Sequence, residues 1–251
     1  MEDMENKVSE GGEAALKPSF KQKVENFWYH YKWHTIAAIF AIIVLTVCTL
    51  QMCRKTSYDV HITYAGYYEI ERVGSGGSSP YSEAVTSFSR LCEDFDGDGE
   101  INISLQTLFV VSDEEREMLI GNDGKLEINE ALVKEDTDTL KSELIYGDQY
   151  VFFVSESIFR EYEAAYEGTL FLPLGEYATE NDDFVFASEN KTGVYLNSLE
   201  ISRLPILSDM PEDTIVCMRA LSEVSQVFGK AQNEENYRRG IEVIKNIFEF
   251  K

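Results

Sequence analysis

QYVFFV, residues 149–154, is a continuous apolar run of the kind found in the middle of a parallel sheet, where both faces of a strand are covered. Directly behind it, Ser155 or Ser157 can cap a helix that extends through Tyr166. A strand followed at once by a helix is the unit from which α/β sheets are built. The stretch therefore predicts an α/β fold.

Upstream of this stretch, strand-like and helix-like segments alternate. Residues 59–65, DVHITYA, place apolar side chains at every second position, as a half-buried strand does. A helix is expected from Pro80, a second strand over 101–111, a short helix behind a Ser112 and Glu115 capping box, and another helix over 136–146. This order continues the alternation that is typical of an α/β sheet.

Downstream, further short strands are expected at 171–174, 183–187, 193–196 and 214–219. The chain closes with a helix from about Glu234, because Tyr237, Ile241, Ile244 and Phe248 follow the i, i+4, i+7, i+11 spacing of one helical face. Residues 58–251 show no internal repeat and no boundary. They are therefore predicted to form one domain with an open, mixed or mostly parallel sheet flanked by helices.

Residues 35–53, TIAAIFAIIVLTVCTLQMC, are predicted to form one transmembrane helix. The run has nineteen residues and no charge, and as a helix it spans about 28 Å, close to the hydrocarbon thickness of a bilayer. Aromatic residues precede it, and Arg54 and Lys55 follow it, as at the two interfaces of a membrane. Because 34 residues precede the run and no small-residue cleavage site follows it, we expect an uncleaved anchor.

Basic residues near this segment set its expected orientation. Those on the N-terminal side outnumber those on the other side, the two sets being Lys17, Lys21, Lys23 and Lys32 against Arg54 and Lys55. Residues 1–34 are therefore predicted to be a cytoplasmic tail, and residues 54–251 an extracellular domain held at the cell membrane. Residues 20–33 carry an apolar stripe, which predicts either a helix in the headgroup layer or a continuation of the transmembrane helix into water.

The predicted extracellular domain is strongly acidic. Residues 56–251 carry fifteen Lys and Arg against thirty-nine Asp and Glu, a net charge of −24. Such a domain repels phosphate, which argues against nucleic acid as a partner. A small neutral or cationic solute, or another envelope protein, is the expected partner, besides the lipid bilayer at residues 35–53. Cys92 and Cys217 can pair but give no disulfide framework.

One acidic turn resembles a calcium loop. Asp94, Asp96, Asp98 and Gly99 match D-x-D-x-D-G, in which three carboxylates converge on a hard cation and glycine permits the tight turn. Together with Glu100 these aspartates are the candidate calcium ligands. Position twelve, however, is Leu105 where an EF-hand has a bidentate Glu, so the alternative is an acidic turn without a metal.

Two further segments are candidate ligand contacts. The loop GSGGSS, residues 74–79, lies between a strand and a helix N-terminus, where backbone N–H groups can receive a polar or anionic group. It lacks the lysine of a phosphate-binding loop, so a flexible connection is the alternative. Tyr64, Tyr67 and Tyr68 just before it can stack on a sugar or a peptide, or belong to the core or the surface.

Catalytic chemistry has little support in the sequence. His61 is the only histidine of residues 56–251, and it lies inside a strand pattern, which favours a structural role. No phosphate-binding, metalloprotease, kinase or nucleophile-elbow motif is present. We therefore expect a non-enzymatic, membrane-tethered binding or interaction module without a cofactor other than calcium. The alternative is a cell-envelope hydrolase that uses paired carboxylates, with or without calcium.

Residues 147–177, GDQYVFFVSESIFREYEAAYEGTLFLPLGEY, resemble the central segment of bacterial extracellular solute-binding proteins. The whole layout is similar to uncharacterised single-pass bacterial membrane proteins with such domains. The resemblance implies a periplasmic-binding-like fold, in which loops at the carboxyl ends of the strands hold a small ligand. Ser155, at the end of the expected strand, is a candidate ligand contact together with Tyr64, Tyr67 and Tyr68. The domain is shorter than the two full lobes of such proteins. The alternative to ligand capture is therefore a scaffold that has lost it and contacts other proteins.

Overall fold

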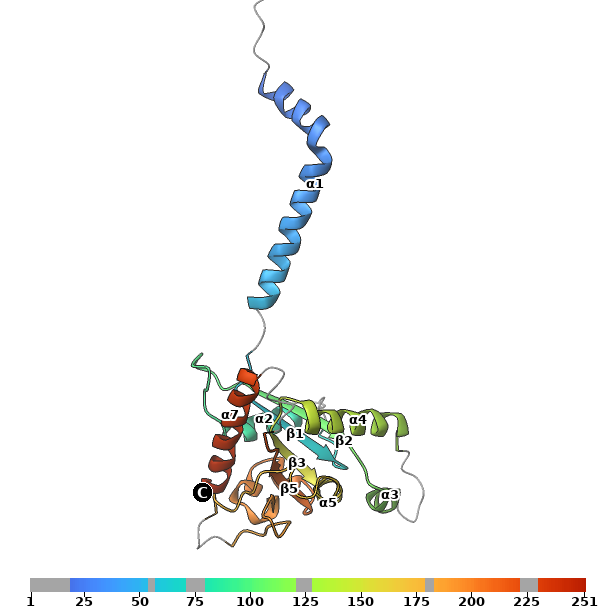
Figure 1. Ribbon diagram of the computed structural model, residues 1–251, viewed down its shortest axis with the longest axis vertical. Coiled ribbons are helices and arrows are strands. Elements are labelled where there is room, and N and C mark those ends of the chain that lie inside the picture. Colours follow the sequence, from blue (N-terminus) through green and yellow to red (C-terminus); the bar gives the residue numbers. More distant parts are fainter. Residues whose placement is uncertain (1–18, 54–56, 71–79, 121–127, 179–182, 222–229) are drawn as a thin grey trace, which may run out of the picture. The chain divides into compact units, whose positions relative to one another are not determined.

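A long helix and an α/β unit make up the chain in the computed structural model (Figure 1). The structure describes residues 19–53, 57–70, 80–120, 128–178, 183–221 and 230–251. The chain divides into one unit up to Thr56 and a second unit from Ser57 to Lys251. The candidate loop at 74–79 lies outside the described residues.

The first unit contains helix α1, Phe20–Cys53. The predicted juxtamembrane and transmembrane segments are thus one continuous helix, which bends along its N-terminal part (Figure 1). Its segment Phe27–Thr49 is long and apolar enough to cross a membrane, and none of it is buried within the protein. Trp28 and Trp33, the only tryptophans of the chain, both lie in this helix and are exposed.

The second unit is built on a five-stranded mixed sheet, which confirms the predicted α/β class with a mixed sheet flanked by helices. The strand order is β2-β1-β3-β5-β4. The strands are β1 (Val60–Gly66), β2 (Ile103–Phe109), β3 (Val151–Ser155), β4 (Gly193–Tyr195) and β5 (Thr214–Met218). The pairs β2-β1 and β1-β3 are parallel, whereas β5 runs antiparallel to both β3 and β4. Because β5 is reversed, its first residue lies beside the last residue of β3, with Thr214 opposite Ser155.

Helices cover both faces of this sheet (Figure 1). One face packs on α2 (Pro80–Ser89) and α7 (Lys230–Glu249), through residues such as Phe88 and Ile244. The other face packs on α4 (Glu130–Tyr146) and α5 (Glu156–Ala165), through residues such as Leu140 and Phe159. All five residues of β3 are buried, as the apolar run at 149–154 predicts.

Three short 3₁₀ helices lie between β4 and β5 and join the α2 and α7 side of the core. They are η1 (Leu196–Ser198), η2 (Glu200–Arg203) and η3 (Leu207–Asp209). A further α-helix, α3 (Asp113–Ile120), begins at the predicted capping box. In that box Glu115 accepts a hydrogen bond from the Ser112 N–H, and the Ser112 hydroxyl accepts one from the Glu115 N–H.

Several expected boundaries differ from the structure. Helix α4 begins at Glu130, before the predicted residue 136, because the Asn129 side chain caps it by accepting from the Leu132 N–H. Residues 171–174 and 183–187 were predicted as strands, yet they form only the isolated bridges Phe171–Arg219 and Phe186–Val194. Each of these segments pairs at a single position, so neither builds a ladder.

The two cysteines of the α/β unit are separated by the sheet. Cys92 packs in the core on the α2 and α7 side, whereas Cys217 packs on the α4 and α5 side. Both are free thiols in the structure. Burial raises the pKa of Cys92 to about 12, with a smaller contribution from the charge of Asp59. A disulfide between them would require the sheet to open.

Candidate functional site

The carboxyl ends of β1 and β3 form the topological switch point of this sheet. From β1 the chain crosses to β2 on one side, and from β2 it returns to β3 on the other side of β1. In open α/β sheets a crevice forms at such a point, because the loops after the two strands lead in opposite directions. Tyr67, Ser155 and Asp213 all lie in the segments that end or begin at this edge.

Tyr64 is buried beneath the switch point. Its side chain is 1% exposed, and its hydroxyl oxygen accepts a hydrogen bond from the Tyr68 N–H at 3.1 Å. A Cβ atom at Gly66 would lie 2.7 Å from that hydroxyl oxygen, so the position has no room for a side chain. Burial raises the pKa of Tyr64, and the nearby charges of Asp213 and Glu115 raise it further. Tyr64 is thus a neutral, structural residue under the site.

Tyr67 and Asp213 connect the end of β1 to the start of β5. The Tyr67 hydroxyl donates to Asp213 Oδ1 at 2.9 Å. Both side chains are half-buried. Burial raises the pKa of Asp213, the hydrogen bond from Tyr67 opposes this rise, and the charges of Glu115 and Glu156 add to it. The edge therefore favours a proton or another cation beside Asp213.

Glu115 connects α3 to the first turn of α5. It is 2% exposed, its Oε1 accepts from the Ser157 hydroxyl at 2.6 Å, and its Oε2 accepts from the Ser112 N–H at 2.7 Å. Ser155 occupies the N-cap position of α5, but its hydroxyl contacts Ser157 Oγ at 3.2 Å and makes no capping hydrogen bond. Ser155, Ser157 and Glu115 thus form one hydrogen-bonded chain across this edge.

An open cleft of about 630 Å³ lies beside this chain, between α3 and α5. Ser112 and Ser157, which hold Glu115, are part of its wall. The remaining lining residues are Val111, Asp113, Glu114, Arg160 and Glu161. The guanidinium of Arg160 is already paired with Glu156 through Nε at 2.7 Å. The cleft is therefore a predominantly anionic wall that carries two serine hydroxyls.

The acidic turn is held by hydrogen bonds from its backbone N–H groups to its own aspartates. Asp94 accepts from the N–H groups of Gly97 at 2.6 Å and Gly99 at 2.8 Å. Asp98 Oδ1 accepts from the Glu100 N–H at 2.8 Å. Gly97 and Gly99 have φ of 76° and 89°, the left-handed conformation that glycine adopts without strain. The hydrogen bonds from the Gly97 and Gly99 N–H groups lower the pKa of Asp94, with the Gly99 N–H contributing most.

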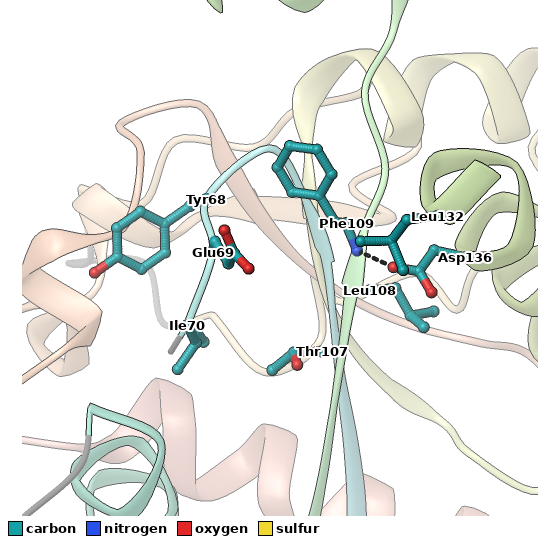
Figure 2. A pocket seen from close by; sticks show the side chains of 8 residues that line it. All are labelled: Tyr68, Glu69, Ile70, Thr107, Leu108, Phe109, Leu132 and Asp136. Carbon is teal, nitrogen blue, oxygen red and sulfur yellow. Dashed lines mark hydrogen bonds between the residues drawn. The ribbon is translucent and has the colours of Figure 1, made fainter. Parts of the chain in front are cut away.

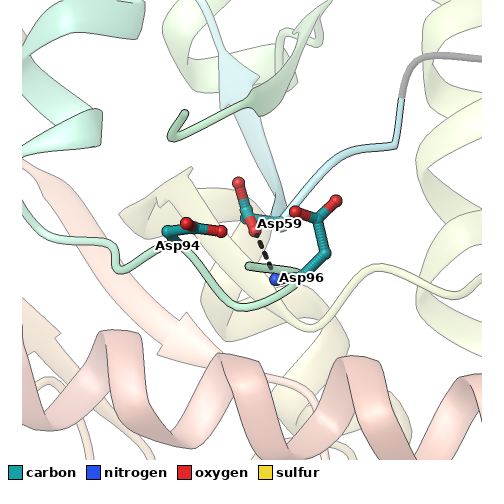
Figure 3. A group of neighbouring side chains, drawn as sticks. All are labelled: Asp59, Asp94 and Asp96. Carbon is teal, nitrogen blue, oxygen red and sulfur yellow. Dashed lines mark hydrogen bonds between the residues drawn. The ribbon is translucent and has the colours of Figure 1, made fainter. Parts of the chain in front are cut away.

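Asp59 joins this turn from the start of β1. Ligand atoms of Asp59, Asp94 and Asp96 lie within 4.8 Å of one another (Figure 3). The expected ligands Asp98 and Glu100 are not members of this group. Asp59 is 1% exposed and accepts three backbone hydrogen bonds, so its first role is to hold the turn. Calcium binding at the turn stays a prediction.

The expected ligand contacts therefore separate into two places. Tyr67 and Ser155 lie at the switch point, above Tyr64. Tyr68 lines a different hollow, at the end of β2 (Figure 2). Sequence reasoning missed Asp213 and interpreted Glu115 only as a helix cap. Asp213 lies directly before a predicted strand. This position places it at the carboxyl end of β3 only because β5 runs antiparallel to β3, which the sequence does not reveal.

His61 lies at the opposite edge of β1 and is half-buried. Burial lowers the pKa of its imidazole, with opposing effects from Asp148, which raises it, and Arg239, which lowers it. Its ring stacks edge-on with Tyr58. A structural role for His61 stays a prediction.

Comparisons with protein-family models, with curated proteins and with solved structures found no match for this chain.

Proposed function

We propose that this chain is a membrane-tethered binding module whose α/β unit lies outside the cell and takes a small cationic solute. The observation that carries the proposal is the convergence of Tyr67, Asp213, Ser157 and Glu115 at the switch point of the sheet. Ligands of open α/β sheets bind at this position. The module is proposed to act without catalysis, because the sequence offers no catalytic motif.

Charge favours a cation over a neutral solute. Asp213 has a raised pKa because it is partly buried near Glu115 and Glu156, and a bound cation would relieve that repulsion. The adjoining cleft adds the carboxylates of Asp113, Glu114 and Glu161. Serine hydroxyls and the Tyr67 ring supply hydrogen bonds and an aromatic surface for an organic cation.

The test is calorimetry on the full chain in nanodiscs, titrated with spermidine, lysine, glucose and citrate. We expect heat from the cations only, and a loss of most of this heat in Asp213→Asn and Tyr67→Phe. Glu189→Gln removes one exposed charge elsewhere and should leave binding unchanged. Equal binding by wild type and Asp213→Asn would refute the assignment of the ligand to this edge.

The orientation is proposed from the lysines that precede the apolar segment. A periplasmic reporter enzyme fused after Lys251 should be active, and protease added to cells without a wall should remove residues 56–251. A reporter that is active only in the cytoplasm would reverse the topology without affecting the binding proposal.

Hydrolysis by paired carboxylates is the second candidate function. The raised pKa of Asp213 near the charge of Glu115 favours it, since glycosidases use one carboxyl group with a raised pKa and a second carboxylate. Release of nitrophenol from chromogenic glycosides, abolished by Asp213→Asn, would support this function. Solute binding without any turnover would support the first.

A further inference from the structure

Among the strands that the structure describes, β2 lies at one edge of the sheet and pairs with β1 on one side. The Asn102 carbonyl accepts from the Asp59 N–H at 2.8 Å, and the Val110 N–H donates to the Gly66 carbonyl at 3.1 Å. Backbone groups of successive strand residues point alternately to the two sides. Residues 103, 105, 107 and 109 therefore direct their N–H and C=O groups away from β1.

Two side chains already bind this outer edge in the way a neighbouring strand would. The Tyr81 hydroxyl donates to the Leu105 carbonyl at 2.9 Å, and the Phe109 N–H donates to Asp136 Oδ2 at 2.7 Å (Figure 2). Thr107 lies between these two positions. Among the described residues no strand pairs with it on this side.

A hollow of about 370 Å³ adjoins Thr107 and reaches around the edge to both faces of the sheet (Figure 2). Ile70 belongs to the core on the α2 and α7 side, whereas Leu108 belongs to the core on the α4 side, and both line the hollow. A strand that pairs with β2 would place alternate side chains against these two walls.

Carboxylates flank the same hollow. Glu69 is exposed, and Asp136 is half-buried with Oδ2 bound to the Phe109 N–H. The surrounding unit has a net charge of −24 over residues 56–251. A second copy of this chain would bring the same negative charge to the edge, whereas a basic segment would neutralise it.

We propose that the outer edge of β2 takes up an extended, lysine- or arginine-containing segment of a partner protein as an added strand. Its backbone pairs with Thr107, and its basic side chain contacts Asp136 and Glu69. This surface lies at the end of β2 and does not use Asp213 or Ser157. The proposal therefore stands or falls independently of the solute site.

The test uses the full chain in phosphatidylcholine nanodiscs and a fluorescein-labelled nonapeptide of alternating threonine, valine and lysine. Fluorescence anisotropy should show saturable binding of this peptide. A peptide with glutamate in place of lysine, and one whose alternate backbone amides are N-methylated, should bind at least about tenfold more weakly, the factor expected from losing one or two hydrogen bonds.

Thr107→Pro is the decisive variant because it removes an N–H that points away from β1 and leaves the β1 pairing intact. It should weaken binding by about tenfold or more, whereas the matched Thr107→Val should bind like wild type. Asp136→Asn keeps an acceptor for the Phe109 N–H and removes one charge, so it should reduce the preference for lysine over glutamate, whereas Glu69 remains.

Amide hydrogen exchange identifies any other occupant. The Thr107 amide should exchange readily in the free protein and become protected when the peptide is added. Protection before the peptide is added would mean that another part of the chain, or a second copy seen by ultracentrifugation, already covers the edge. That result, or equal peptide binding by Thr107→Pro and wild type, would overturn the proposal.

Discussion

Replacement of Asp59 by Ala should be the most destabilising single change at the acidic turn. The Asp59 side chain is 1% exposed. Its Oδ1 accepts from the N–H groups of Phe95 at 2.8 Å and Asp96 at 3.2 Å, and its Oδ2 accepts from the Asn102 N–H at 2.8 Å. One carboxylate thus ties the start of β1 to both ends of the turn that leads into β2.

The size of the effect follows from these three hydrogen bonds. A bond to a charged group contributes roughly 1.5–3 kcal/mol, but water can reach donors that are partly exposed and replace some of it. Phe95 and Asn102 are half-buried and Asp96 is exposed, so we expect Asp59→Ala to lower the free energy of unfolding by about 3–5 kcal/mol. For a unit of this size each kcal/mol lowers Tm by about 2–4 °C.

Urea unfolding of the full chain in detergent, followed by circular dichroism, measures this loss. Asp98→Ala is the matched control, because Asp98 is exposed and accepts one bond, from the Glu100 N–H. It should cost about 1 kcal/mol or less. If Asp59→Ala and Asp98→Ala had equal midpoints, the carboxylate of Asp59 would not hold the turn.

Three further outcomes are expected. The pKa of Asp213 is raised in the folded protein, so the protonated form favours folding. The free energy of unfolding should therefore fall as pH rises from about 4, the ordinary aspartate pKa, through the raised value. Asp213→Asn should flatten this dependence of Tm on pH. Gly66→Ala should lower the free energy of unfolding by about 1–3 kcal/mol, because its Cβ would lie 2.7 Å from the Tyr64 hydroxyl oxygen. Tyr64→Phe should restore part of that loss in a double-mutant cycle. A Gly66→Ala variant as stable as wild type would contradict the close approach. Calcium at up to about 10 mM should raise Tm, and the free energy of unfolding should rise by about 2.7 kcal/mol at a hundredfold excess of calcium over its Kd. Asp96→Asn should remove most of this stabilisation. Equal Tm shifts with magnesium, unaffected by Asp96→Asn, would show that the turn binds no metal specifically.

The elements that the sequence predicted best are those whose signal is local. Residues 151–154 of the QYVFFV run lie in β3, because the apolar run is long enough to fill a strand that is buried on both faces. The Ser112 and Glu115 capping box is confirmed because its two hydrogen bonds form within one helical turn. The start of α4 differs from the predicted residue 136, because the helix begins at Glu130, directly behind its cap Asn129.

The parts that could not be predicted depend on contacts between distant segments. Asp59 lies 37 residues before Asp96, and nothing in the sequence of the turn indicates that a carboxylate reaches it from another strand. The contact of Tyr67 with Asp213 spans 146 residues and exists because β5 is reversed. A motif reveals which chemistry a segment carries, whereas topology decides which segments share it.

Both tryptophans of the chain lie in α1, so their fluorescence reports on this helix separately from the α/β unit. Trp28 and Trp33 both lie in α1, so emission excited at the red edge of the indole band arises from that helix alone. A blue shift on reconstitution would register insertion into lipid and would be insensitive to events in the α/β unit.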